Sequence, residues 1–114
     1  MISHKILPTF GRYMKLRESN ILVVDDDPDV LTAVRLLLKP LVKSIEFSRY
    51  PDEIKSLLKQ KVFDIILLDM NFKSGIQSGN EGIFWLREIK KIAPDSCVIL
   101  ITAYGDIDLA VRSL

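Results

Sequence analysis

The sequence predicts an α/β fold built on a doubly wound parallel sheet with helices on both faces. Short, fully apolar runs at residues 21–24, 65–68 and 98–101 alternate with longer segments whose apolar residues recur every three or four positions. The short runs are typical of strands buried on both faces, and the longer segments are typical of helices that pack one side on a sheet. The chain of 114 residues has the length of one ordinary domain.

The first predicted strand covers residues 21–24, and a helix follows it. Pro28 suits the first turn of that helix, and Asp27 can serve as its N-cap. Pro40 ends the helix, because the residue before a proline avoids helical geometry. An apolar stripe is expected to face the sheet, formed by Val30, Leu31, Val34, Leu37 and Leu38.

Two further strand and helix units are predicted along the chain. A weaker strand at residues 45–48 precedes a helix that opens at Pro51, and the strand at residues 65–68 precedes a polar loop at residues 70–79. Asn80 can cap the next helix. The inward positions of these two helices are Ile54, Leu57, Leu58, Trp85, Leu86, Ile89 and Ile92. The strand at residues 98–101 and a helix at residues 106–114 complete the pattern.

Composition and charge exclude several classes of function. Sixteen Lys and Arg against 15 Asp and Glu give a net charge of +1, so we expect no direct nucleic-acid binding. The apolar runs are too short to cross a membrane, which predicts a cytoplasmic location. The single cysteine, Cys97, is expected to be a small buried hydrophobe. Residues 1–20 are expected to form a flexible arm, in which His4 is solvated.

Three predicted strands end in oxygen-bearing side chains. Asp25 and Asp26 follow the first strand, Asp69 follows the third, and Thr102 follows the fourth. In an open parallel sheet these ends meet at one edge, so we expect three carboxylates and a hydroxyl in one pocket. Carboxylates so close together repel unless they are protonated or share a cation. Oxygen ligands with room for water suit Mg²⁺.

The same parts predict phosphoryl transfer. Asp69 ends the most central strand and is the expected nucleophile, forming an aspartyl phosphate. Asp26 is expected to bind the metal directly, Asp25 through water, and Asp69 is an expected ligand as well. The Thr102 hydroxyl is expected to meet a phosphoryl oxygen, and the backbone carbonyl of Asn71 is a further expected metal ligand. Each residue taken singly also fits a helix cap or a turn, so the prediction depends on their convergence.

The segments at residues 21–28, 64–70 and 98–106 resemble the receiver domains of two-component response regulators, and Thr102 to Asp108 most resembles the nitrogen-regulation (NtrC-type) subgroup. The resemblance implies a flavodoxin-like fold with strand order 2-1-3-4 over residues 21–114. It also implies a phospho-acceptor domain rather than an enzyme with a separate substrate. A sensor histidine kinase would be its phosphodonor, and ATPase and DNA-binding output domains would lie outside this chain.

The chain departs from the family pattern in two places. The fifth strand, with its phosphate-pairing lysine, and the fifth helix are absent from this chain, so the strand at residues 98–101 is expected to have a bare edge that favours a homodimer. The loop after Asp69 is longer than usual and lacks the common proline. Lys73, in that loop, is expected to be solvated.

Two alternatives from other classes stay open at this point. A haloacid dehalogenase-type phosphatase would use Asp25 as its nucleophile, and it would leave the strand end at Asp69 without a role. A receiver-like interaction module would not take phosphate at all. The residue that becomes modified discriminates between these interpretations: Asp69, Asp25 or neither.

Overall fold

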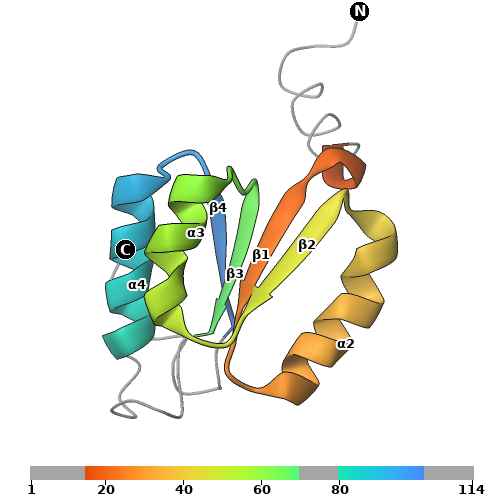
Figure 1. Ribbon diagram of the computed structural model, residues 1–114, viewed down its shortest axis with the longest axis horizontal. Helices are drawn as coiled ribbons and strands as arrows, with labels where there is room; N and C mark the ends of the chain where they lie inside the picture. The colour runs from red at the N-terminus through yellow and green to blue at the C-terminus, as the bar shows by residue number, and fades with distance from the viewer. Residues whose placement is uncertain (1–14, 70–79, 102–114) are drawn as a thin grey trace, which may run out of the picture.

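The structure is a computed structural model that describes residues 15–69 and 80–101. Figure 1 shows an open sheet of parallel strands with helices on both of its faces. The strands are β1 (Asn20–Val24), β2 (Ser44–Ser48), β3 (Ile65–Asp69) and β4 (Cys97–Ile101). The α-helices are α2 (Pro28–Leu38), α3 (Ile54–Gln60) and α4 (Asn80–Ile92), and the 3-10 turns are η1 (Lys15–Glu18), η2 (Lys39–Leu41) and η3 (Pro51–Glu53).

The sheet has the order β2-β1-β3-β4, and each neighbouring pair is parallel. The predicted order 2-1-3-4 is therefore confirmed, as are the four predicted strands to within one residue at each end. The register aligns Val24 with Leu68 and Asp69 with Ile101. All four strands thus finish at one edge of the sheet, which is the edge where the candidate site lies.

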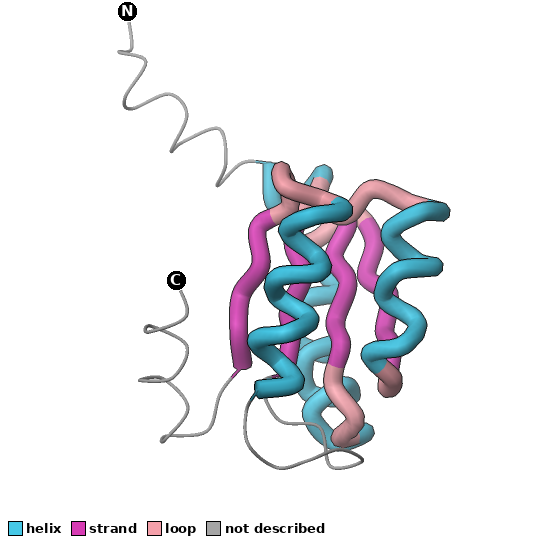
Figure 2. The backbone as a smooth tube through the Cα atoms, turned by 90° about the vertical axis from the view of Figure 1, so that its left-hand side faces the viewer, coloured by secondary structure: helices cyan, strands magenta, loops and turns pink. Residues whose placement is uncertain are grey.

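The main core lies between the sheet and the pair α3 and α4. Figure 2 shows these two helices side by side in front of the strands. Alternate residues of β1 and β3 point into this layer, as the period of a strand requires. The buried cluster consists of Leu22, Val24, Ile54, Phe63, Ile66, Leu68, Trp85 and Ile89. Half-buried Leu57, Leu58 and Leu86 pack against it, so most of the inward positions predicted for these helices are confirmed.

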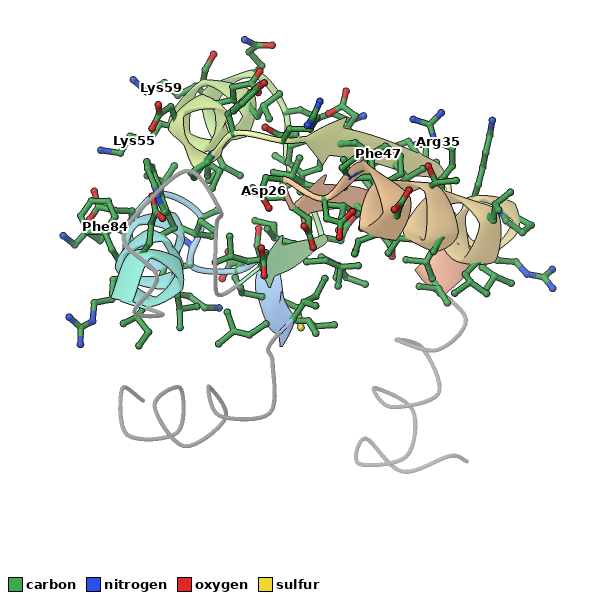
Figure 3. All side chains as sticks on the ribbon, turned by 90° about the horizontal axis from the view of Figure 1, so that it is seen from below. Asp26, Arg35, Phe47, Lys55, Lys59 and Phe84 are labelled. Carbon is green, nitrogen blue, oxygen red and sulfur yellow. The ribbon has the colours of Figure 1, made fainter. Side chains whose placement is uncertain are left out.

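The opposite face of the sheet is less completely covered than the sequence predicted. α2 packs against β2, and none of its residues is buried. Leu37, predicted to face the sheet, is 70% exposed, whereas the other four members of its stripe are half-buried. Ile65 and Leu67 are likewise only half-buried. Among the described residues, α2 alone lies over this face, and it sits beside β1 and β2 rather than β4 (Figure 3).

Cys97 is exposed, so the prediction of a buried thiol is wrong. Cys97 pairs in register with Ile65, and Ile99 pairs with Leu67, which places both β4 residues on the less covered face. Ile99 is 47% exposed for the same reason. The apolar run had predicted a strand correctly, but it had not predicted which face of that strand is covered.

Backbone and side-chain hydrogen bonds tie the starts of three strands together at the edge opposite the candidate site. The Asn20 N–H donates to Asp64 Oδ2 at 2.8 Å, and the Asp64 N–H donates to the Asn20 carbonyl at 2.9 Å. The Cys97 N–H donates to the Asp64 carbonyl at 2.9 Å. These contacts fix the register of β1, β3 and β4 and therefore fix how their far ends align.

Several predictions concern residues outside the described ranges. The polar loop at residues 70–79, the helix at residues 106–114 and His4 all lie there. α4 begins at Asn80, in agreement with a helix start at that residue. Part of the predicted arm is described: residues 15–18 form η1, and the Ser19 carbonyl accepts from the N–H groups of Lys43 and Ser44. Within residues 15–69 and 80–101, no helix has the length and apolar character needed to cross a membrane.

Glu88 of α4 pairs with Lys55 of α3 and with Lys91 of its own helix. Its Oε1 lies 3.2 Å from Lys55 Nζ, and its Oε2 lies 3.0 Å from Lys91 Nζ. The Lys55 ammonium also lies 6.0 Å from the centre of the Trp85 ring, within reach of a cation–π contact. Hydrogen bonds from Lys91 and Lys55 lower the pKa of Glu88 below its usual 4.5, and the one from Lys91 has the larger effect.

We expect Glu88→Gln to lower the urea midpoint of the chain at about pH 7 and to lower it less at about pH 3. A lowered pKa in the folded state stabilises the fold above the unfolded pKa, and this contribution is lost as the pH falls through the folded pKa. Urea unfolding at the two pH values measures the difference. Asp95→Asn, which removes one charge from an exposed residue beyond α4, should show no such pH dependence; an equal shift in both variants would refute the bridge.

Candidate metal centre and phosphorylation site

Asp25 is the first residue after β1, and it is 3% exposed. Its N–H donates to the Ser48 carbonyl at 3.0 Å, which continues the β1–β2 pairing one residue beyond the strand. Its Oδ1 accepts from the Asp27 N–H at 2.9 Å. Both the backbone and one carboxylate oxygen of Asp25 are therefore held by hydrogen bonds at the edge of the sheet.

Asp26 and Asp69 complete the predicted acidic cluster. One carboxylate oxygen from each of Asp25, Asp26 and Asp69 can be chosen so that all three lie within 4.8 Å of one another. Asp69 is the last residue of β3, and both it and Asp26 are half-buried. Figure 3 shows Asp26 near the middle of the sheet edge, between α2 on one side and α3 and α4 on the other. The predicted convergence of the three carboxylates is confirmed.

The spacing of the three oxygens fits a small divalent cation. Two ligands on opposite sides of one Mg²⁺ are about 4.2 Å apart, since each bond is about 2.1 Å long. A spread of up to 4.8 Å is therefore slightly wider than three direct ligands would have, and a water between one carboxylate and a bound ion would span the difference. Negative charges this close repel, and a cation among them would remove that cost.

Asp27, the third consecutive aspartate, is placed differently. Its Oδ1 accepts from the Asp29 N–H at 2.9 Å, and its backbone is extended with φ −87° and ψ 111°. It is the N-cap of α2, as predicted, and Pro28 takes the first position of the helix. Within the described residues, the acidic group that could hold an ion does not include Asp27.

Sequence reasoning missed the residues that support Asp25 from β2. Ser48 is 3% exposed, and its hydroxyl lies 2.9 Å from both the Tyr50 carbonyl and Glu53 Oε1. The hydroxyl carries one hydrogen and donates to one of these oxygens at a time. These contacts fix the turn from β2 into η3 and thereby the carbonyl that receives the Asp25 N–H. A serine at the end of a predicted strand was a weak signal, because strand-end serines are common in turns.

Thr102, Asn71 and Lys73 lie outside the described residues. The predicted roles of Thr102 and of the Asn71 carbonyl therefore stay predictions. The described part of the site is the buried Asp25, the half-buried Asp26 and Asp69, and the Ser48 and Asp27 backbone groups that position Asp25.

A family model described as the response regulator receiver domain matches residues 21–114. The chain belongs to this family. The match covers all four strands and all three acidic residues of the cluster. It also argues against the haloacid dehalogenase alternative, which would leave Asp69 without a role.

A solved relative supports both the family and the fold. The N-terminal signal receiver domain of a two-component response regulator from Bacteroides fragilis is 47% identical to the chain, with a TM-score of 0.72. The alignment covers 82% of this chain and 74% of that one. The flavodoxin-like arrangement expected from the sequence is thus found in an experimentally determined receiver domain of high similarity.

The curated relatives of the chain are regulators of the NtrC type. The chain is 31% identical over 93 residues to the response regulator protein PilR of Pseudomonas aeruginosa, and 32% identical over 101 residues to the transcriptional regulatory protein ZraR of Klebsiella oxytoca. These matches cover 82% and 89% of this chain. The chain spans only 20% and 22% of the length of the two relatives, which corresponds to their receiver part.

Proposed function

We propose that this receiver domain accepts a phosphoryl group on Asp69 from the phosphohistidine of a sensor kinase, in a Mg²⁺-dependent reaction. The observation that carries the proposal is the approach of Asp25, Asp26 and Asp69 to within 4.8 Å at the ends of β1 and β3. An acidic cluster of this kind costs electrostatic energy unless a cation offsets it. Family membership makes phosphoryl acceptance the reaction that such a cation would serve.

In the proposed reaction, one carboxylate oxygen of Asp69 attacks the phosphorus in line with the imidazole nitrogen of the donor. The O–P bond forms as the N–P bond breaks, and the imidazole leaves with the electron pair and then takes a proton. Bound Mg²⁺ would supply positive charge to the transferring oxygens. Asp26 would hold it directly, and Asp25 would do so through water.

Hydrogen bonds to Asp25 support this division of roles. Its Oδ1 already accepts from the Asp27 N–H, and it is the most deeply buried of the three aspartates. A buried carboxylate held in one orientation suits a fixed water-mediated contact, because little side-chain freedom is lost on binding. Thr102 would donate its hydroxyl to a phosphoryl oxygen, and the Asn71 carbonyl would complete the metal ligands.

The partners of the domain follow from the same family. A sensor histidine kinase would donate the phosphoryl group, and ATPase and DNA-binding domains of the kind found in NtrC-type regulators would carry the output. The receiver itself would make no direct contact with nucleic acid, in keeping with its net charge of +1. A cytoplasmic location is part of the proposal, because a regulator of transcription acts where the DNA is.

The proposal is tested by the intact mass of the chain after incubation with acetyl phosphate. We expect the mass to rise by one phosphoryl group when Mg²⁺ is present. We expect it to stay unchanged when EDTA has removed the Mg²⁺. Reduction of the acyl phosphate with borohydride, followed by peptide mapping, should locate the modification at Asp69. No gain in mass under any of these conditions would instead support a phosphorylation-independent interaction module.

A second copy of the chain is a further proposed partner. Within residues 15–69 and 80–101, β4 pairs only with β3, and Ile99 on its less covered face is 47% exposed. An apolar strand with one unpaired edge favours pairing with another chain. We expect the 114-residue chain to be at least dimeric at about millimolar concentration. A monomer mass by light scattering at that concentration would refute this expectation.

A further inference from the structure

The carboxylates of the three consecutive aspartates after β1 make different contacts. The carboxylates of Asp25 and Asp26 belong to the acidic cluster with Asp69, whereas the Asp27 carboxylate is bound to the start of α2. Asp27 nevertheless touches the cluster through its backbone, since its N–H donates to Asp25 Oδ1 at 2.9 Å. One residue therefore contacts both the helix start and the most deeply buried aspartate of the cluster.

We propose that Asp27 is a positioning residue that orients the Asp25 carboxylate for Mg²⁺ through the N-cap of α2. This inference rests on the proposed function, because it presupposes that the acidic cluster binds Mg²⁺. Asp27 itself does not touch the ion. Its role is to fix the direction of its own N–H group and so the orientation of the carboxylate that accepts from it.

The first step of the argument is that the Asp27 backbone is held from the helix side. Its Oδ1 accepts from the Asp29 N–H at 2.9 Å, and its carbonyl accepts from the Leu31 N–H at 3.1 Å. Pro28 restricts the next φ angle to the value that a helix start requires. With the side chain and the carbonyl both bound to α2, the Cα of Asp27 is held in place, and so is the backbone nitrogen attached to it, whose N–H reaches Asp25.

The second step is that Asp25 is held from two sides. The Asp25 N–H donates to the Ser48 carbonyl at 3.0 Å, so β2 fixes its backbone. The Asp27 N–H then fixes one oxygen of its carboxylate. If the cap were lost, α2 would no longer hold that N–H, and the Asp25 carboxylate would have to be ordered again whenever the cation binds.

Variants of Asp27 can distinguish the effect of the helix cap on Mg²⁺ binding from the effect of the negative charge alone. Asp27→Asn removes the negative charge but keeps a side-chain oxygen that can cap the helix. Asp27→Ala removes both the charge and the cap. Asp29→Asn is the matched charge control, because Asp29 is exposed and uses only its backbone N–H in the cap.

The experiment is a calorimetric titration of the 114-residue chain and its variants with MgCl₂, with the thermal midpoint of each metal-free protein recorded alongside. We expect Asp27→Asn and Asp29→Asn to weaken Mg²⁺ binding by similar small factors. Asp27→Ala should weaken it by a further factor of roughly five, the value that corresponds to the loss of one helix cap. A purely structural cap would lower the thermal midpoint in Asp27→Ala without adding this loss of affinity.

Asp27→Gly provides the same test if Asp27→Ala does not fold. Glycine at an N-cap preserves helix stability almost completely but offers no side-chain oxygen. We expect it to bind Mg²⁺ more weakly than Asp27→Asn. Equal affinities in Asp27→Asn and in the Ala or Gly variant would overturn the inference and leave the proposed function intact. A wild-type chain that binds no Mg²⁺ would overturn both.

Discussion

Asp69→Asn is expected to abolish the phosphoryl gain of the chain with acetyl phosphate and Mg²⁺. Asparagine has nearly the same shape as aspartate, but its amide oxygen is a poor nucleophile and cannot form an acyl phosphate. Asp69 ends β3 beside Asp25 and Asp26, so an amide there leaves the fold and the other two carboxylates in place. Intact mass measured over the time in which the wild type is fully modified would give the result.

The matched control for this variant is Asp52→Asn. Asp52 is an exposed residue of η3, and its substitution changes the net charge by the same amount. We expect it to be phosphorylated like the wild type. A phosphoryl gain that survives in Asp69→Asn would contradict the proposed acceptor, and its location at Asp25 would revive the phosphatase-type alternative.

Asp26→Asn is expected to have opposite effects on two quantities. It should not lower the stability of the metal-free protein, but it should weaken the binding of Mg²⁺. In the absence of Mg²⁺, removal of one of three close carboxylates relieves repulsion, so the thermal midpoint should be at least as high as that of the wild type. With Mg²⁺ at about 100 times its dissociation constant, the wild type should gain about 2.7 kcal/mol and the variant almost none. Thermal unfolding with and without Mg²⁺ measures both effects.

Two outcomes would count against this view of the cluster. A lower metal-free midpoint in Asp26→Asn would mean that the Asp26 carboxylate stabilises the fold through its other contacts rather than opposing it. An unchanged Mg²⁺ effect would mean that the ion does not bind at this edge. Asp29→Asn, on the exposed side of the same turn, should behave like the wild type in the metal-free protein.

Three of the four strands could be predicted because their apolar runs are strong and independent signals, whereas the strand order was predicted from the resemblance to receiver domains. Each apolar run was long enough for a strand and too short for most helices, and each was followed by a residue typical of a loop or a helix start. The N-cap at Asp27 could be predicted for the same reason, since an aspartate followed by Pro28 is favourable at a helix start and unfavourable within one.

Burial was predicted correctly only where another element covers the apolar side of the helix or strand concerned. Leu37, Cys97 and Ile99 have apolar side chains in elements that were correctly predicted, yet all three are exposed. Periodicity identifies the apolar side of an element, but what lies against that side depends on segments far away in the chain. On the α3 and α4 side, where the partners are described, the same reasoning found Ile54, Trp85 and Ile89 correctly.

The acidic cluster could be predicted from the sequence, but the backbone groups that hold Asp25 in place could not. Asp25, Asp26 and Asp69 follow strands of one parallel sheet, so topology alone brings them to one edge. Ser48 and Asp25 are more than 20 positions apart and contact each other through backbone atoms. Because almost every residue carries the same backbone groups, the sequence does not indicate which of them form a hydrogen bond. The N–H group of Asp27 is invisible to sequence reasoning for the same reason.

The exposed thiol of Cys97 is a site where the protein can be labelled with a reporter group. It is the single cysteine of the chain and stands at the first residue of β4, while Asp69 pairs with Ile101 at the last. Four residues of strand separate the two ends by about 13 Å. A maleimide dye or a nitroxide would therefore attach at one defined position without touching the acidic cluster. Such a probe could follow phosphorylation, kinase docking or self-association in real time, in the unmutated protein.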